Sequence, residues 1–198
     1  KNIIFDVGQV LVDYDWETYL DSFGFEPAKR ERIAKATFQS PVWDERDRGL
    51  YEEDVYLKQF QELDPEDAED IEKVIRGTGG TIHKRPYADT WVKYLKSKGY
   101  HVYILSNYSS YMLDHTKKEL TFRREMDGEV FSCYAKQLKP DAEIYQIILN
   151  KYQLKPEECV FIDDRSENCR GAQEQGIHTI CFKDFKQVTA DLEKLGVK

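Results

Sequence analysis

Four short fragments of the sequence contain the side chains that could do chemistry. They are Asp6, Ser106 with Asn107, Lys139 before Pro140, and the acidic pair Asp163-Asp164. Three of these fragments directly follow apolar runs, and open α/β sheets place their chemistry where buried strands end. A carboxylate, a hydroxyl, an ammonium group and two further carboxylates can together carry out phosphoryl transfer. The first question is therefore whether the fold brings the four fragments to one place.

Asp6 could be a nucleophile, a metal ligand or the N-cap of the next segment. A carboxylate that attacks phosphorus forms an aspartyl-phosphate, and Mg²⁺ between the two anions removes their repulsion. Asp163 and Asp164 follow the run Val160–Ile162 and could supply further oxygen ligands, which Mg²⁺ prefers. Because neighbours at a strand end point in different directions, we expect Asp164 on the metal and Asp163 in a supporting role. A solvated turn is the alternative for this pair.

Ser106 and Asn107 end the run Val102–Leu105. A hydroxyl and an exposed backbone N–H at this point could hold phosphate oxygens. The same two residue types are also favoured as helix N-caps, and the two interpretations are compatible because a helix N-terminus binds anions. Lys139 could neutralise Asp6 and the transferring phosphoryl group, although taken alone it would be read as a surface lysine.

Short apolar runs alternate with helical patterns outside residues 14–85. The expected strands are Ile3–Phe5, Val102–Leu105, Val130–Tyr134, Val160–Ile162 and Thr179–Phe182. The expected helices are Tyr87–Lys98, Ser109–Lys118, Asp141–Tyr152, Ser166–Gln175 and Asp184–Leu195. Continuous apolar runs suit strands that are buried on both faces, as in parallel sheets. The alternation predicts an α/β fold with a Rossmann-like parallel sheet.

Residues 14–85 show a different pattern, with no convincing strand. The expected helices are Asp15–Phe23, Pro27–Phe38, Tyr51–Leu63 and Pro65–Arg76. We therefore expect a core domain of residues 1–13 and 86–198, and an inserted all-helical cap domain of residues 14–85. An insertion over the edge of the sheet would form a lid, with Gly77–Thr81 as the return hinge.

Composition excludes several classes of protein. The net charge of −8 argues against binding to a nucleic-acid backbone. No apolar stretch approaches the roughly 20 residues that span a bilayer, and the chain shows no signal-peptide pattern. The four cysteines form no C-x-x-C pair, so we interpret them as reduced thiols in a cytoplasmic protein. The sequence does not indicate an oligomeric state.

Together the four fragments resemble the motifs of the haloacid dehalogenase superfamily of hydrolases. The motifs are Phe5–Asp13, Leu105–Asn107, Lys139–Asp141 with Ile144-Tyr145, and Phe161–Asp164 with Asn168. The resemblance implies a parallel-sheet core with a helical cap, and Asp6 as nucleophile. It implies Mg²⁺ bound by Asp6, Asp164 and the carbonyl of Gly8. It also implies that Ser106 and Lys139 hold the phosphoryl group and that Asn168 supports the metal site.

Gly8 departs from the pattern of the family's phosphatases. They usually carry a second Asp there as acid and base, help that is typically worth roughly 10²–10⁴-fold. Asp13 is the nearest spare carboxylate, although it could instead brace the loop. The strings Asp6–Val10, Arg48-Gly49 and Lys139-Pro140 look most like a bacterial α-glucose-1-phosphate phosphatase subgroup, which also has Gly at this place.

The expected cap contains the polar run Trp43–Arg48. One aromatic face beside carboxylates and guanidinium groups suits a polyol, so Trp43 and Arg48 are candidate substrate-binding residues. The alternative is a solvated helix end with local salt bridges.

Three functions compete at this stage. The first is an Mg²⁺-dependent phosphatase for a small phosphorylated metabolite, with a sugar phosphate as the expected substrate. The second is a metal-free 2-haloacid dehalogenase in which Asp6 attacks carbon, which the acidic pair argues against. The third is a catalytically weak binding or regulatory module, which Gly8 keeps open. A phosphomutase ranks below these, because it must reprotonate a second hydroxyl without the acid/base Asp.

Overall fold

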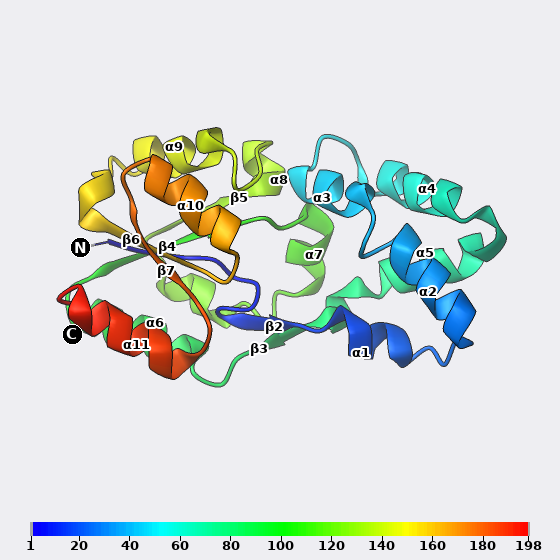
Figure 1. Ribbon diagram of the computed structural model, residues 1–198, viewed down its shortest axis with the longest axis horizontal. Helices are drawn as coiled ribbons and strands as arrows, with labels where there is room; N and C mark the ends of the chain where they lie inside the picture. The colour runs from blue at the N-terminus through cyan, green and yellow to red at the C-terminus, as the bar shows by residue number, and fades with distance from the viewer. Residues whose placement is uncertain (1, 198) are drawn as a thin grey trace.

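The computed structural model describes residues 2–197, and its centre is a five-stranded sheet (Figure 1). In spatial order the strands are β5 (Gly128–Phe131), β4 (His101–Ser106), β1 (Asn2–Phe5), β6 (Cys159–Asp163) and β7 (His178–Cys181). All neighbouring pairs are parallel. Every residue of the central strands β1 and β6 is buried, which explains their continuous apolar runs. The expected Rossmann-like core is confirmed.

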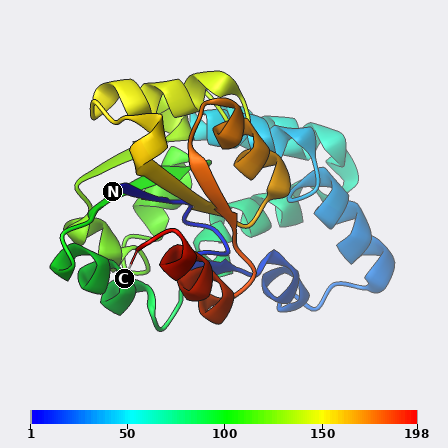
Figure 2. The same cartoon turned by 60° about the vertical axis from the view of Figure 1, so that its left-hand side comes forward.

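Helices cover both faces of this sheet (Figures 1 and 2). One face carries α6 (Ala88–Ser97), α7 (Ser110–His115), the 3₁₀ turn η3 (Thr121–Glu125) and α11 (Phe185–Lys194). The other carries α9 (Ala142–Lys151) and α10 (Ser166–Glu174). Ile3 and Phe5 of β1 belong to the first apolar cluster and Ile4 to the second, the two-residue period of a strand.

The strand order fixes where a site can form. From β1 the chain proceeds to β4 and β5 on one side, and then crosses to β6 and β7 on the other. The order therefore reverses between β1 and β6. In open α/β sheets, ligands bind in the crevice outside the carboxyl ends of the strands at such a reversal. Asp6 and the pair Asp163-Asp164 stand at these two strand ends.

The segment between β2 (Val12–Tyr14) and β3 (Ile82–Lys84) forms a helical insertion, which we define as residues 16–81. It contains α1 (Trp16–Asp21), α2 (Pro27–Ala36), α3 (Pro41–Arg48), α4 (Glu53–Leu63), η1 (Pro65–Asp67), α5 (Ala68–Arg76) and η2 (Thr78–Thr81). Its helices bury their own apolar cluster, which includes Leu20, Phe60 and Ile71. Both chain termini lie at the end of the core that is remote from it (Figure 1).

A two-stranded antiparallel ribbon joins the insertion to the core. It pairs β2 (Val12–Tyr14) with β3 (Ile82–Lys84). The expectation that residues 14–85 contain no strand is therefore wrong. Each strand has only three residues and exposes polar side chains such as His83. Strands of three residues are too short to show an alternation of apolar and polar residues in the sequence. Only their pairing in the structure defines them.

Two further elements differ from the expectation. Helix α3 was not expected, because only Arg46 is buried along it and its local pattern shows no apolar face. The expected strand Val130–Tyr134 is wrong in its second half, since β5 ends at Phe131 and α8 (Ser132–Ala135) begins directly. The 3₁₀ turn η4 (Pro156–Glu158) then leads into β6.

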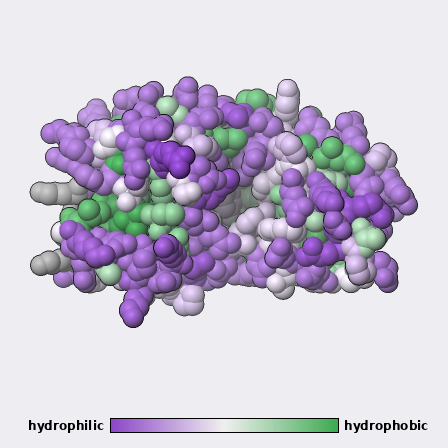
Figure 3. Space-filling model, in the orientation of Figure 1, coloured by the Kyte–Doolittle hydropathy of each residue, from purple (hydrophilic) through white to green (hydrophobic). Residues whose placement is uncertain are grey.

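The surface is mainly hydrophilic on the face seen in Figure 3, with apolar residues gathered in limited patches. Among the described residues 2–197, no helix is long and apolar enough to cross a membrane. The cysteines carry free thiols, and Cys133, Cys159 and Cys169 are buried.

Candidate active site

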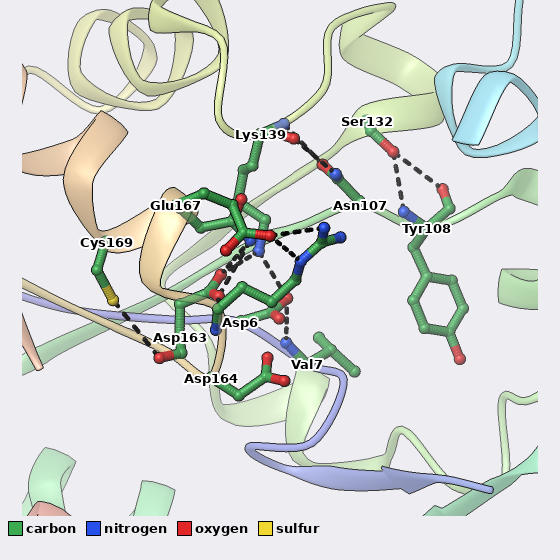
Figure 4. Close-up of polar contacts among 12 residues, drawn as sticks. Asp6, Val7, Asn107, Tyr108, Ser132, Lys139, Asp163, Asp164, Glu167 and Cys169 are labelled. Atoms are coloured by element: carbon green, nitrogen blue, oxygen red, sulfur yellow. Dashed lines mark hydrogen bonds and ion pairs between the residues drawn. The ribbon is translucent and has the colours of Figure 1, made fainter. Parts of the chain in front are cut away.

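Side chains from three parallel strand ends meet at the sheet edge, and Figure 4 shows Asp6 and Asp163 among them. Asp6 follows β1, Ser106 ends β4, and Asp163 ends β6. The Asp6 N–H donates to the carbonyl of Ile162 at 2.9 Å, which ties the end of β1 to the end of β6. Oxygen atoms of Asp6, Asp163 and Asp164 lie within 4.8 Å of one another. The fold thus assembles a carboxylate cluster from two distant parts of the sequence.

Lys139 lies at the centre of this cluster and is buried. Its Nζ lies 2.9 Å from Asp6 Oδ1 and 2.6 Å from Asp163 Oδ2. Asn107 fixes the Lys139 backbone, because its Oδ1 accepts from the Lys139 N–H at 2.9 Å and its Nδ2 donates to the Lys139 carbonyl at 3.1 Å. Helix α10 packs closely on the next residue, since a Cβ on Gly171 would lie 2.5 Å from the Pro140 carbonyl oxygen. The lysine is therefore held in position from its backbone to its ammonium group.

The two neighbouring aspartates have different surroundings. Asp163 is fully buried, and besides Lys139 it accepts hydrogen bonds from the Arg165 N–H at 2.8 Å and from Asn168 Nδ2 at 3.0 and 3.1 Å. Asp164 is only partly buried and lines the cavity described below, which Asp163 does not. Asp163 therefore orients Lys139 and Asn168, whereas the Asp164 carboxylate is open to a ligand.

The charges in this cluster do not balance, because three carboxylates face one ammonium group. Burial raises the pKa of Asp6 to about 6, although Lys139 opposes the shift, and the charge of Asp163 adds to it. Burial and the charge of Asp163 likewise raise the pKa of Asp164. Burial alone would lower the pKa of Lys139, but its two carboxylate partners raise it, so this group keeps its proton. The site has a surplus of negative charge.

This donor set fits a divalent cation. Carboxylate oxygens of Asp6 and Asp164 are the hard ligands that Mg²⁺ prefers, and a cation would offset the surplus charge. Gly8 also lines the site and offers a carbonyl without a side chain in the way. The buried Asn168 Oδ1 has no hydrogen-bond partner within residues 2–197, which leaves one polar atom available at the site's edge.

A cavity of about 290 Å³ opens from this cluster toward the helical insertion. Its core side is formed by Asp6, Gly8, Gln9, Ser106, Asn107, Tyr108, Ser109, Met112, Lys139, Asp164, Arg165 and Asn168. Its other side is formed by Phe38, Trp43, Asp44 and Asp47 of the insertion, with Tyr14 and Ile82 of the ribbon. One wall is thus polar and charged, and the facing wall combines aromatic rings with carboxylates.

Most of the residues singled out in the sequence line this cavity, but Asp163, Arg48 and Asp13 do not. Asp163 acts on the site through its contacts with Lys139 and Asn168. Arg48 is not among its lining residues, and its Nε lies 3.3 Å from Glu45 on the outer side of α3. The geometry therefore does not support Arg48 as a substrate-facing residue. Asp13 also lies outside the lining and pairs with Arg85 at 2.9 Å, in accord with its alternative interpretation as a brace.

Several lining residues were not singled out in the sequence. Asp47 is the most informative of them, because it lines the cavity and its carboxylate lies near the backbone N–H of Ser109 in the core. Trp43 and Asp47 are four residues apart, and Asp44 and Asp47 three apart, so in a helix all three share one face. That spacing was a usable signal, but only if residues 41–48 were expected to be helical.

The chain belongs to the haloacid dehalogenase-like hydrolases, because the model of that family matches residues 1–176. It is 26% identical to D-ribitol-5-phosphate phosphatase of Bacteroides thetaiotaomicron over 190 residues, covering 90% of each chain. It is 25% identical to flavin mononucleotide hydrolase 1 of Arabidopsis thaliana, covering 98% of this chain and 77% of that protein. It is 30% identical to rat bifunctional epoxide hydrolase 2, but it spans only 19% of that protein.

Solved structures show the same fold. A HAD family enzyme of Bacteroides thetaiotaomicron, in complex with magnesium and inorganic phosphate, superposes with a TM-score of 0.75 at 23% identity. The match covers 95% of this chain and 98% of that one. L-2-haloacid dehalogenase of Xanthobacter autotrophicus superposes with a TM-score of 0.67 at 16% identity, covering 100% of this chain and 84% of that one. The fold is therefore shared by relatives that are named for different reactions.

Proposed function

We propose that this protein is an Mg²⁺-dependent phosphatase that hydrolyses a small phosphoric monoester through an aspartyl-phosphate on Asp6. The observation that carries the proposal is the meeting of Asp6, Asp163 and Asp164 within 4.8 Å, with Lys139 2.9 Å from Asp6. A dehalogenase that attacks carbon has no need for so much negative charge beside its nucleophile. A phosphatase does, because the charge binds the cation that brings a phosphate dianion close.

Asp6 is the proposed nucleophile. Its Oδ1 accepts hydrogen bonds from the Val7 N–H at 2.7 Å and from Lys139 Nζ, so the carboxylate is fixed in one orientation. The Ser106 hydroxyl lies near this carboxylate and, against the larger effect of burial, lowers its pKa. A fixed nucleophile loses little freedom when it reacts, which favours attack on a bound phosphorus centre. Water then hydrolyses the aspartyl-phosphate and releases inorganic phosphate.

Ser106, Asn107 and Lys139 are the proposed phosphate-binding groups, and all three line the cavity. Asp6, Asp164 and the Gly8 carbonyl are the proposed metal ligands, with Asp163 and Asn168 in support. When bound, Mg²⁺ neutralises charge on the phosphoryl oxygens. The relative crystallised with magnesium and inorganic phosphate, although similar in fold only, supports this proposal.

For the leaving group we propose a sugar or sugar alcohol, with residues 14–85 as the cap domain that selects it. A cavity of about 290 Å³ suits a small metabolite, and its insertion wall pairs an aromatic ring, Trp43, with the carboxylates of Asp44 and Asp47. A relative named D-ribitol-5-phosphate phosphatase supports the class. The resemblance of the first motif to α-glucose-1-phosphate phosphatases supports a sugar 1-phosphate within it.

The test is turnover of 4-nitrophenyl phosphate with Mg²⁺, with EDTA, and by the Asp6→Asn variant with Mg²⁺. We expect release of inorganic phosphate only in the first condition. Asp13→Asn is the matched control, because it makes the same change on a half-exposed carboxylate outside the cavity. Metal-independent halide release from a 2-haloacid would replace the proposal with the dehalogenase. No turnover by the folded protein on any substrate would favour a binding module.

A further inference from the structure

The proposed reaction needs a proton donor that the core wall of the cavity does not provide. In an in-line displacement the leaving oxygen lies on the side of phosphorus opposite to Asp6, which is the side that faces the insertion. Gly8 has no side chain to offer. Lys139 holds its proton between two carboxylates that raise its pKa, and burial raises the pKa of the Tyr14 phenol well above its usual range. The donor must therefore come from another lining residue.

Asp47 reaches this side of the cavity from α3 and is held by the core at both ends. Its carboxylate lies near the Ser109 N–H, in the loop that continues from Ser106. The Ser132 hydroxyl donates to the Asp47 backbone carbonyl at 2.5 Å. The Ser132 Oγ in turn accepts from the Tyr108 N–H at 2.8 Å. The carboxylate is thus fixed against the phosphate-binding loop. Asp44, the other carboxylate on this wall, is exposed.

The end of α3 is docked on the core by close contact. Gly49 adopts a left-handed conformation with φ of 71°, and a Cβ there would lie 3.0 Å from Cys133. Lys136 Nζ donates to the Gly49 carbonyl. A residue two positions before this contact has little freedom to move away from the core, so the position of Asp47 is a property of the docked insertion.

The environment of Asp47 suits a group that gives up a proton and takes one back. Burial raises its pKa to about 7, Arg46 opposes the shift, and Asp44 and then Asp6 add to it. The charged and titratable groups that face it are Asp44 and Arg46 on its own helix, Asp6 after β1, Tyr14 on β2, Tyr108 before α7, and Cys133 on α8. A pKa near the working pH is the condition for efficient general acid–base catalysis.

We propose that Asp47 is the general acid and base of the reaction, a role that rests on the proposed phosphatase function. In the first step Asp6 bonds to phosphorus, the bond to the leaving oxygen breaks, and the Asp47 carboxyl gives its proton to that oxygen to form the alcohol. In the second step water attacks phosphorus from the vacated side and its proton passes to the Asp47 carboxylate. The bond from phosphorus to Asp6 breaks, and phosphate leaves.

A purely structural role is the competing explanation, since Asp47 also caps the loop before α7. Asp47→Asn separates the two, because Asn keeps an oxygen acceptor of the same shape near the Ser109 N–H but has no acidic proton. With an alkyl or sugar phosphate, whose leaving oxygen needs a proton, we expect kcat to fall by roughly 10²–10⁴-fold. With 4-nitrophenyl phosphate, whose leaving anion is stable, we expect a burst of one nitrophenolate per enzyme followed by slow turnover.

Glu45→Gln on the same helix is the matched control, because Glu45 is exposed and outside the cavity lining. Gly8→Asp combined with Asp47→Asn tests rescue, since a Cβ at Gly8 meets nothing within 4 Å. We expect the double variant to recover part of the lost turnover. In Asp47→Asn alone, we expect the change of kcat with pH near 7 to be absent.

Two results would overturn the role of Asp47. One is turnover of alkyl phosphates by Asp47→Asn within about threefold of the unmodified chain. The other is an equal loss for alkyl and aryl phosphates with no burst, which is what a disturbed fold produces. Both are distinct from failure of the proposed function, in which the unmodified chain itself shows no Mg²⁺-dependent turnover.

Discussion

The two walls of the cavity are built in different ways. On the core wall, Asp6, Ser106 and Asp164 stand at the ends of parallel strands or directly after them. Lys139 lies in the loop between α8 and α9, Asn168 lies on α10, and buried hydrogen bonds hold the site. On the insertion wall, the rings of Phe38 and Trp43 pack at an angle of 48° with 5.0 Å between their centroids, and Asp44 and Asp47 supply the carboxylates. The backbone topology fixes the first wall, whereas the docking of α3 fixes the second.

This difference separates two tasks of an enzyme. Binding phosphate and attacking it need charges in fixed places, which a sheet edge supplies. Selecting the leaving group and exchanging protons with it can be done from the opposite wall, whose residues can change without disturbing the sheet. The absence of a side chain at Gly8 is consistent with this division, because it leaves proton transfer to the insertion.

The largest effect is expected at the core wall, from Lys139→Met. The change leaves Asp6 and Asp163 buried without their shared cation, and breaking a buried ion pair costs about 3–5 kcal/mol of unfolding free energy. In protein that stays folded, loss of this group from the transition state lowers kcat/KM by roughly 10²–10³-fold or more. Denaturant unfolding and steady-state kinetics measure the two effects.

Lys58→Met is the control for this variant, because Lys58 is exposed on the insertion. It should change neither quantity beyond experimental error. Retention of most activity by Lys139→Met would contradict the account of the core wall, since a cation at that position would then be dispensable.

Two matched substitutions test whether the walls are separate folding units. Phe60 of the insertion cluster and Phe161 of the sheet are both fully buried, and each change to Ala is expected to cost about 3–5 kcal/mol locally. We expect Phe60→Ala to raise amide exchange in residues 16–81 while β1 and β6 stay protected. Phe161→Ala should raise exchange throughout. Identical patterns in the two variants would show that the walls unfold as one.

The core wall was readable in the sequence, whereas on the insertion wall only Trp43 was singled out. Asp6, Ser106, Asp163 and Asp164 each adjoin an apolar run, so a local signal located them at strand ends. The face of α3 depends on the rotation of a short helix whose apolar pattern is absent. Neighbouring residues of a helix face different directions, and the sequence analysis chose Arg48 rather than Asp47. Arg48 pairs with Glu45 away from the cavity, whereas Asp47 lines the cavity. Tertiary docking, rather than local preference, decides that rotation.

A smaller effect is expected on the insertion wall, from Trp43→Ala compared with Arg48→Ala. Trp43 lines the cavity, so its loss should raise KM for the best sugar phosphate by about tenfold, equivalent to about 1.4 kcal/mol. Inhibition by inorganic phosphate should not change, because the proposed phosphate-binding groups lie on the core wall. Arg48→Ala should alter KM by less than about twofold. The reverse ranking would restore Arg48 as the substrate-facing residue.

The smallest effect is expected from the ion pairs that Asp67 of the insertion makes with Lys29 and Arg32. Acid is expected to remove stability here, whereas at Asp6 it removes an unfavourable buried charge. Burial alone would raise the pKa of Asp67, but hydrogen bonds from Lys29 and Arg32 lower it. A lowered carboxyl pKa adds stability above the unfolded-state value of about 3.9, and this contribution is lost as pH falls through the folded-state pKa. Burial raises the pKa of Asp6 instead, so its charged form costs stability at neutral pH.

Asp67→Asn should therefore destabilise the protein by about 1 kcal/mol at pH 7 and by less as the pH approaches 3, measured by urea unfolding. The exposed Glu62→Gln provides the baseline. A penalty for Asp67→Asn that is the same at both pH values would mean that packing, and not charge, holds this side of the insertion together.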